Sequence, residues 1–379
     1  MGSNNWSCGV LLLVFVVVVC EGSSSDQVVG LGFVETRGTE FVIEGTTFLF
    51  NGFNSYWMMD VAAQPNQSYK ISNVFRETTA AGLTVCRTWA FTSVCFQALD
   101  FVISEARRYR VRLILSLVNN YQDYGGRPQY VKWAKSAGVP IKSDDDFYTN
   151  AVLKTYYKNH KMLTRINTIT GIAYKDDATI MAWELMNEPR CQVDNSGNTI
   201  NGWVEEMANY VKSIDNKHLV EVGMEGFYGD SMASRKQYNP NGYQVGTDFI
   251  TNNLVKAIDF ATIHAYPDVW WLEIHWTDSR SILKRPLIFS EFGKSKKDPG
   301  YSESGRNKFL NIVYEKIYNL ARIGGISGGL VWQIMGQGME SYYDGYEIVL
   351  SQNPSTANIV SQQSKKMTAL QHNLTDPHA

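Results

Sequence analysis

Two glutamates stand at the ends of separate apolar runs, where a buried strand should give way to a loop. Glu188 ends the stretch Ala-Trp-Glu-Leu-Met-Asn-Glu, and Glu291 lies in Ile-Phe-Ser-Glu-Phe-Gly. Two carboxyl groups that face each other can hydrolyse a glycoside, because one protonates the leaving oxygen while the other attacks the anomeric carbon or activates water. Unequal surroundings would separate their pKa values, so that one is an acid and the other an anion at the same pH. Either glutamate taken alone could instead be a solvated loop charge.

Several further polar and aromatic residues end apolar runs in the same way. An amide directly before an acid, such as Asn187, can bind the sugar hydroxyl next to the reacting carbon, and Pro189 then turns the chain away. A third acid, Glu225, either lines the same cleft or is solvated. The other candidates at strand ends are Arg87, Asn119, Asn120, His264, Tyr266 and Trp332. For His264 the alternative is a buried histidine bonded to backbone, and for Trp332 it is core packing.

The elements that would position these residues alternate between two periodicities. Apolar, β-branched runs predict strands at residues 48–51, 84–89, 112–118, 180–186, 219–224, 260–263, 287–290 and 326–334. Segments with helical spacing separate them, for example at residues 96–106, 203–214 and 309–320, and residues 353–370 can supply the last helix. This alternation predicts parallel strands closed into a (β/α)8 TIM barrel, with residues 33–43 and 47–50 as a short N-terminal β-hairpin cap. The active site of such a barrel lies at the carboxyl ends of its strands, where the candidate residues stand.

The composition is that of one large globular domain. The chain has 379 residues, of which 44% are hydrophobic, and no linker or repeat divides it, so residues 26–379 are predicted to form a single domain. The net charge of −2 argues against a nucleic-acid partner, because such proteins usually carry a basic excess on one face. The 10 Trp and 21 Tyr suit stacking on sugar rings, although core packing explains many of them.

The N-terminal stretch predicts export. Residues 10–19 are apolar but too few for a spanning helix of roughly 20 residues, so residues 1–25 are predicted to be a cleaved signal peptide, with a retained anchor as the alternative. Asn66 and Asn373 begin acceptor triplets for glycosylation, which agrees with secretion. We therefore expect an extracellular or cell-wall protein with no membrane contact after cleavage.

The cysteines remaining after signal removal are few and widely spaced. They are Cys86, Cys95 and Cys191, which allow at most one internal disulfide and leave a thiol. Their spacing suits no zinc site. We expect no metal and no cofactor.

Six longer motifs reveal a resemblance to a known family. They are Arg87-Thr-Trp-Ala-Phe91, Trp183-Glu-Leu-Met-Asn-Glu-Pro-Arg190, Glu225-Gly-Phe-Tyr228, Val245-Gly-Thr-Asp-Phe249, His264-Ala-Tyr-Pro-Asp268 and Phe289-Ser-Glu-Phe-Gly-Lys294. From about Gly32 to the last helix, the chain resembles the plant endo-β-1,4-mannanases of glycoside hydrolase family 5. The resemblance implies a retaining endo-hydrolase of mannan, glucomannan and galactomannan. We expect such a polysaccharide as the substrate partner and a monomeric protein. Glu188 would be the general acid/base, and Glu291 the nucleophile.

The resemblance also implies roles for the other strand-end residues. Arg87 and Tyr266 would hold the nucleophile ionised and oriented, as a cation and a phenol within hydrogen-bond reach can. Asn187 would bind the sugar hydroxyl, His264 would be the histidine of the cleft, and Trp332 would be the platform under the sugar whose bond is cut. We further expect Trp57 to form the wall of another subsite.

Two loops on the catalytic face are shorter here than is usual in that family. Only residues 92–95 separate Phe91 from the next helix, and residues 271–275 follow Trp270 at once. The loops after strands 2 and 6 are therefore shortened, which makes a catalytically weak or inactive glycan-binding relative an alternative. A β-1,4-glucanase of the same fold is another, and a retaining intermediate could also be captured by a sugar, which is transglycosylation.

Overall fold

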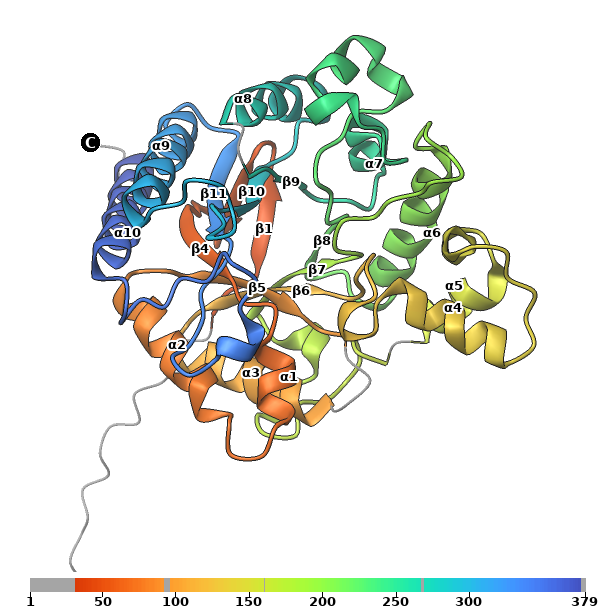
Figure 1. Ribbon diagram of the computed structural model, residues 1–379, viewed down its shortest axis with the longest axis horizontal. Helices are drawn as coiled ribbons and strands as arrows, with labels where there is room; N and C mark the ends of the chain where they lie inside the picture. Colours follow the sequence, from red (N-terminus) through yellow and green to blue (C-terminus); the bar gives the residue numbers. More distant parts are fainter. Residues whose placement is uncertain (1–30, 92–95, 160, 267–268, 376–379) are drawn as a thin grey trace, which may run out of the picture. The chain divides into compact units, whose positions relative to one another are not determined.

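Eight parallel strands form the centre of the protein in this computed structural model, which describes residues 31–91, 96–159, 161–266 and 269–375. The strands are β4 (Phe50–Asn54), β5 (Val85–Trp89), β6 (Arg112–Ser116), β7 (Ile180–Glu184), β8 (Leu219–Glu221), β9 (Ala261–His264), β10 (Leu287–Phe292) and β11 (Ile326–Val331). They are ordered β8-β7-β6-β5-β4-β11-β10-β9, so the predicted TIM barrel is confirmed. At the seam between β8 and β9, the amide of Asp259 donates to the carbonyl of Val220 at 2.8 Å. The ring of strands is therefore nearly closed (Figure 1).

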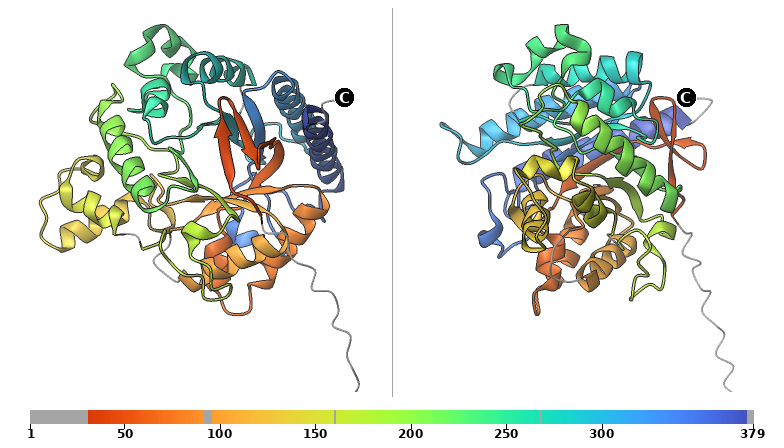
Figure 2. Two further views of the ribbon diagram at one scale, coloured as in Figure 1. Left: turned by 180° about the vertical axis from the view of Figure 1, so that it is seen from behind. Right: turned by 90° about the vertical axis from the view of Figure 1, so that its right-hand side faces the viewer.

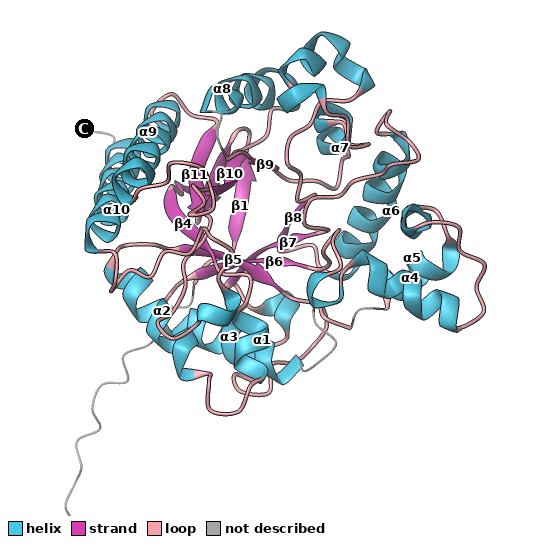
Figure 3. Ribbon diagram, in the orientation of Figure 1, coloured by secondary structure: helices cyan, strands magenta, loops and turns pink. Residues whose placement is uncertain are grey.

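Helices surround the strands and supply the crossovers (Figure 3). They are α1 (Met58–Ala63), α2 (Tyr69–Ala80), α3 (Phe96–Arg108), α4 (Arg127–Ser136), α5 (Ala151–Lys158), α6 (Asn198–Ile214), α7 (Phe249–Leu254), α8 (Val269–Asp278), α9 (Glu303–Ala321) and α10 (Pro354–Thr375). Helix α3 shows why these segments pack on the barrel: Leu99, Val102 and Ala106 recur at helical spacing and are buried. Helix α10 confirms the predicted closing helix.

A small antiparallel sheet precedes the barrel and differs from the predicted hairpin. Its strands are β1 (Val34–Arg37), β2 (Glu40–Ile43) and β3 (Thr46–Thr47), in the order β1-β2-β3. The first turn contains Gly38 at φ +60°, a conformation that glycine adopts without strain. Because Thr46 and Thr47 pair with β2, the first barrel strand begins at Phe50 rather than at residue 48. The prediction of one hairpin was thus one strand short.

The small sheet closes the amino end of the barrel. Phe41 is fully buried, and its ring meets Phe260 edge-on with centroids 5.1 Å apart. The core cluster there also contains residues at or near the starts of barrel strands, such as Phe50, Val85 and Leu219. In the right panel of Figure 2, the red N-terminal strands lie at one end of the barrel, and the blue segment with the short helix Glu340–Tyr342 lies at the other. The functional residues are at that second end.

Helix α8 covers the barrel although the loop before it is short. Trp271, Leu272 and His275 are buried, and His275 Nε2 lies 2.7 Å from the carbonyl oxygen of Gly226. A π-helical turn, Ser279–Leu283, extends α8. Residues 92–95 and 267–268 of the two shortened loops lie outside the described residues, so the effect of those loops stays a prediction.

The predicted signal peptide, with its boundary at residue 25, also lies outside the described residues, as does Cys95. Cys86 and Cys191 are buried free thiols. Over the described ranges, no helix combines the length and apolarity needed to cross a membrane.

Candidate active site

The side chain of Arg87 connects several of the predicted site residues through hydrogen bonds. It lies in β5, its side chain is fully buried, and each of its five N–H groups has an acceptor. Nε and Nη2 donate to the two carboxylate oxygens of Glu184 at 2.5 and 2.7 Å, and Nη2 also donates to Asn187 Oδ1 at 2.7 Å. Nη1 donates to Glu291 Oε1 at 2.6 Å and to Asn54 Oδ1 at 3.1 Å. The guanidinium is therefore fixed in one plane, with one nitrogen on Glu291.

The two glutamates face each other across the barrel mouth. Glu291 lies in β10, and Glu188 follows β7 with φ +50°, a strained conformation for a residue other than glycine. The amide of Glu188 donates to the carbonyl of Gly223 at 2.8 Å and holds this turn in place. Ligand-type atoms of Glu188, His264 and Glu291 all lie within 4.8 Å of one another. A carboxyl separation of about 5 Å is typical of retaining rather than inverting glycosidases.

The surroundings of the two carboxyl groups differ. Burial raises the pKa of Glu291, but His264, Arg87 and a 2.5 Å hydrogen bond from Tyr266 Oη oppose the rise. Burial also raises the pKa of Glu188, where Arg190 and a hydrogen bond from Tyr121 oppose it. Glu291 is in direct contact with the buried cation Arg87, whereas no lysine or arginine among the described residues forms an ion pair with Glu188. Glu291 is therefore the better anion and Glu188 the better acid.

His264 stands between the two carboxyl groups at the end of β9. Its Nδ1 lies 2.8 Å from Glu188 Oε1 and 3.5 Å from Glu291 Oε1. Burial lowers the pKa of His264, so the ring is neutral at pH 7. The three residues have donor types that can bind a metal, but a cation there would compete with Arg87 for Glu291.

A cleft of about 510 Å³ opens above these groups. Its aromatic lining consists of Tyr56, Trp89, Tyr121, Tyr124, Tyr266, Trp332 and Tyr346. Trp332 follows β11, and its Nε1 donates to Asp344 Oδ2 at 2.8 Å, which fixes the indole. The ring of Tyr56 stacks parallel to it, with centroids 5.8 Å apart and 12° between the planes. Flat aromatic walls with polar rims can hold sugar rings.

Trp57 does not form a subsite wall, and this prediction was wrong. Its side chain is fully buried, and its Nε1 donates to the carbonyl of Ile334 at 3.2 Å. The chain enters α1 at this point, which turns Trp57 into the core and the preceding residue, Tyr56, toward the cleft. One position along the sequence separates the two environments.

Glu225 lies partly buried in an ion pair and is not among the residues that line the cleft. Both of its carboxylate oxygens accept hydrogen bonds from Arg190, at 2.6 and 2.9 Å. Burial, followed by the neighbouring Glu188, nevertheless raises the pKa of Glu225 to about 7. Of the two strand-end amides, Asn119 accepts from Asn187 Nδ2 at 2.9 Å, and Asn120 is buried beside it in sequence.

Sequence reasoning missed most of the aromatic lining. Trp89 does end the apolar run of β5, so its position gave a signal, but a tryptophan there reads equally well as core. Tyr121, Asp344 and Tyr346 lie in loops, and Tyr124 lies in the short 3-10 turn Asp123–Gly125, where no periodicity marks a functional side chain.

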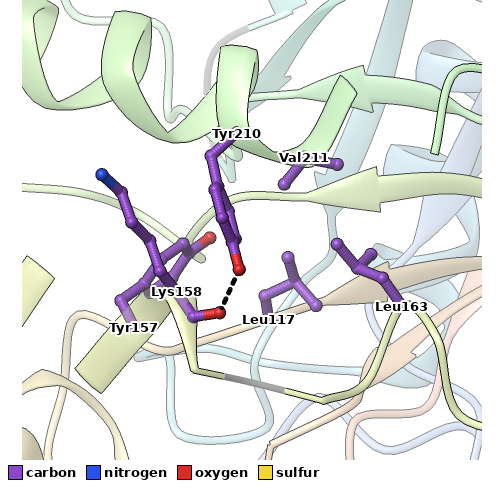
Figure 4. A pocket seen from close by; sticks show the side chains of 6 residues that line it. All are labelled: Leu117, Tyr157, Lys158, Leu163, Tyr210 and Val211. Atoms are coloured by element: carbon purple, nitrogen blue, oxygen red, sulfur yellow. Dashed lines mark hydrogen bonds between the residues drawn. The ribbon is translucent and has the colours of Figure 1, made fainter. Parts of the chain in front are cut away.

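A second, much smaller cavity lies outside the candidate active site. It holds only about 10 Å³ and lies between the end of α5 and helix α6 (Figure 4). Tyr210 Oη points into it but donates to the carbonyl of Lys158 at 2.7 Å, and Leu117, Leu163 and Val211 line the rest. This cavity is too small to hold a ligand larger than water.

A parallel barrel with two unequal, buried carboxyl groups and an aromatic cleft at the carboxyl ends of its strands defines the class of retaining glycoside hydrolases. The family model described as glycoside hydrolase family 5, β-mannosidase-like, matches residues 84–345. The chain belongs to this family.

Proteins of similar sequence indicate to which subgroup of the family the chain belongs. Mannan endo-1,4-beta-mannosidase 5 of Solanum lycopersicum is 57% identical over 389 residues, covering 94% of this chain and 93% of the relative. Mannan endo-1,4-beta-mannosidase 7 of Arabidopsis thaliana is 47% identical over 392 residues, covering 95% and 91%. Within the family, the chain thus groups with the plant mannan endo-1,4-β-mannosidases.

Solved structures agree on the fold. The endo-1,4-beta-mannanase from Rhizomucor miehei is 29% identical with a TM-score of 0.75, over 89% of this chain and all of that one. The endo-beta-1,4-mannanase from Thermotoga petrophila is 29% identical with a TM-score of 0.73, over 84% of this chain and 77% of that one.

Proposed function

We propose that this protein hydrolyses internal β-1,4-mannosidic bonds in mannan, glucomannan and galactomannan with retention of configuration. The observation that supports this most directly is the pair Glu188 and Glu291, close together in the cleft but with unequal partners. The mannan substrate rests on the plant relatives, and no step calls for a metal or cofactor.

The first half of the reaction breaks the glycosidic bond. The Glu291 carboxylate attacks the anomeric carbon and forms a glycosyl ester, while Glu188 gives its proton to the leaving oxygen. Arg87 and Tyr266 hold the two oxygens of Glu291 before the attack, at 2.6 and 2.5 Å. Asn187 is positioned by Arg87 and Asn119 to bind the neighbouring sugar hydroxyl.

The second half releases the product. Glu188, now ionised, takes a proton from water, and the hydroxide attacks the anomeric carbon, so that the ester bond to Glu291 breaks. Two inversions at one carbon give net retention. Neutral His264, 2.8 Å from Glu188, orients this carboxyl in both halves. Trp332 serves as the platform under the sugar whose bond is cut.

The test is reducing-end release by the purified protein from galactomannan and glucomannan, with cello-oligosaccharides as the comparison. We expect turnover on the mannans and a loss of about 10³-fold or more in Glu188→Gln and in Glu291→Gln. Glu206→Gln, a glutamate on α6 held by Lys154 and Lys158, is the remote control and should retain activity. Preference for cello-oligosaccharides would favour the glucanase alternative. Glycan binding without turnover by folded protein would favour the inactive relative.

The two roles can be separated with azide and an aryl β-mannoside. Azide should rescue Glu188→Ala with a β-mannosyl azide as product, because the ester still forms and azide needs no base. In Glu291→Ala, azide can only attack directly and should give the α-azide. The opposite assignment of products would reverse the two roles.

We also propose that the protein is exported to the cell wall through a signal peptide at residues 1–25. In support, Asn66 is exposed in the turn between α1 and α2, where a glycan can be accommodated. Expression in plant cells should yield secreted protein whose mass falls on deglycosylation. Asn66→Gln should reduce that fall, and Asn66→Gln combined with Asn373→Gln should abolish it. Intact, unglycosylated protein retained inside the cells would contradict export.

A further inference from the structure

Two buried glutamates that take no part in the proposed reaction lie beneath Arg87. Glu184 ends β7 and Glu221 ends β8, and the two are paired in the parallel register of these neighbouring strands. Both are completely buried, and their side chains point into the barrel, toward the layer of the site. Burying two charged carboxylates side by side is unfavourable, so the protonation state of each group matters.

The hydrogen-bond partners of the two residues differ. Glu184 accepts from Arg87 with both oxygens. Glu221 Oε2 accepts from the amide of Gly223 at 2.5 Å and from Thr262 Oγ1 at 2.9 Å. In the part of the chain that the structure describes, no donor reaches Glu221 Oε1. The carboxyl groups of Glu221 and Glu184, paired in register, lie within hydrogen-bond reach of each other. Two ionised carboxylates cannot share a hydrogen bond, whereas a carboxylic acid can donate one to a carboxylate.

The charges of the neighbouring groups indicate which of the two glutamates carries a proton. Arg87 is one cation, and Glu184 and Glu291 already give it two anionic partners. An ionised Glu221 would add a third negative charge to a buried layer. Arg87 is the cation with the largest effect on Glu221, and it already has two anionic partners, while Thr262 from β9 is neutral. Arg87 binds Glu184 directly, so Glu184 is the carboxylate.

We propose that Glu221 is a permanently neutral carboxylic acid whose Oε1–H donates to Glu184. This acid–carboxylate pair then positions Arg87 against the nucleophile. The second part rests on the role proposed above for Glu291. Both glutamates are positioning residues, because they reach the reaction only through Arg87.

The electrostatic surroundings agree with this arrangement. Burial, together with the neighbouring Glu184, raises the pKa of Glu221 well above its usual range. Burial also acts on Glu184, but the charge and hydrogen bonds of Arg87 outweigh it and lower the pKa of Glu184. The pair therefore keeps one negative charge across the working pH range. That charge neutralises Arg87 and leaves its Nη1 free to bind Glu291.

Infrared difference spectroscopy measures the protonation state of Glu221 independently of enzyme activity. At pH 8, wild type minus Glu221→Gln should contain the carbonyl stretch of one protonated carboxyl group and no lost carboxylate band. Wild type minus Glu206→Gln, the surface control, should instead contain a carboxylate band. A lost carboxylate band in Glu221→Gln would overturn the proposal, whatever the enzyme's substrate proves to be.

Kinetics test the positioning role. Glutamine at 221 can donate to Glu184 and accept from Gly223 and Thr262, so Glu221→Gln should keep kcat/KM within about threefold and leave its pH profile unchanged. Glu221→Leu keeps the bulk but removes the donor, and should lower kcat by about tenfold or more with little change in KM. If Glu221→Gln keeps the kcat that Glu221→Leu loses, the hydrogen bond to Glu184 matters for positioning and the effect is not one of packing alone.

Two outcomes would overturn the positioning role. One is a folded Glu221→Leu protein with wild-type kcat. The other is a Glu221→Gln protein as impaired as Glu221→Leu, because an acidic proton or charge would then be needed in the reaction itself. Loss of activity in Glu188→Gln and Glu291→Gln, measured in parallel, reports the proposed function independently of both.

Discussion

Tyr121 and Tyr266 each donate a hydrogen bond to one of the two carboxyl groups that are proposed to react. Tyr266 binds Glu291, which must be ionised to attack, and Tyr121 binds Glu188, which must be protonated to act as the acid. A hydrogen bond to a carboxylate favours its charged form and lowers its pKa. The two phenols should therefore act on opposite limbs of the pH profile.

Tyr266→Phe should move the acid limb of kcat/KM to higher pH. Without the donor the pKa of Glu291 rises, so a higher pH is needed to ionise it, and kcat should fall by about 10- to 100-fold because a hydrogen bond to a charged group is lost. A pH-rate profile on galactomannan checks this. An acid limb at the wild-type position would show that Tyr266 does not act on the charge of Glu291.

Tyr121→Phe should instead move the basic limb. Losing this donor raises the pKa of Glu188, so the acid stays protonated to higher pH and the basic limb extends upward while the acid limb stays fixed. The same profiles measured on both variants control for each other. Movement of the same limb in both would contradict the assignment of acid and nucleophile.

At the scale of elements, one carboxylate ties helix α3 to a loop far along the chain. Asp100 is buried and accepts from Arg165 Nε at 2.9 Å, Thr168 Oγ1 at 2.7 Å and Tyr174 Oη at 2.6 Å. Asn167 Nδ2 also donates to the backbone carbonyl of Asp100 at 3.0 Å. This network holds the loop before β7 against α3, and β7 leads to Glu188.

Asp100→Asn should destabilise the protein by about 2 kcal/mol, because the buried carboxylate that accepts from Arg165, Thr168 and Tyr174 is lost. Burial alone would raise the pKa of Asp100, but the donors, Arg165 first, outweigh it and lower that pKa. The folded state therefore favours the anion, and this stabilisation is present above the ordinary carboxyl pKa and lost as the pH falls through the folded value.

Thermal unfolding from pH 3 to pH 7 measures both effects. Wild type should gain stability as the pH rises through the lower part of this range, and Asp100→Asn should show less of that gain. Asp176→Asn, at an exposed ion pair with Lys217, is the matched control and should change little. Equal slopes in wild type and Asp100→Asn would contradict the account.

At the scale of the whole molecule, stability and chemistry lie at opposite ends of the barrel. Phe41 and its neighbours fill the amino end, whereas Arg87, Glu188 and Glu291 lie at the carboxyl end. Phe41→Ala should therefore lower the free energy of unfolding by about 3–5 kcal/mol through the cavity it leaves. Because the cleft is remote, kcat/KM at a temperature where the variant is folded should match wild type.

Phe41→Leu is the graded control for this separation. It keeps most of the volume and should cost about 1 kcal/mol. Denaturant unfolding gives both values, and assays on the same samples give kcat/KM. A fall in kcat/KM that parallels the loss of stability in the two variants would mean that the small sheet also shapes the cleft.

Sequence alone determined the barrel and most of the residues that the structure brings together in the candidate site, for a physical reason. Parallel strands buried on both faces need continuous apolar runs, and the crossover helices need an apolar stripe, so both leave a periodic trace. The carboxyl ends of the strands then meet at one mouth, which is why Glu188, His264 and Glu291 could be grouped from their positions in separate runs. Their proposed roles came from residue type and resemblance.

Tertiary structure decided what depends on side-chain direction and on partners far apart in the chain. The turn into α1 buries Trp57 and exposes Tyr56 to the cleft, which no local pattern distinguishes. The five acceptors around Arg87, and the proton between Glu184 and Glu221, follow from the register of neighbouring strands and from burial. Hydrogen bonds act over about 3 Å, so only the folded chain can set them.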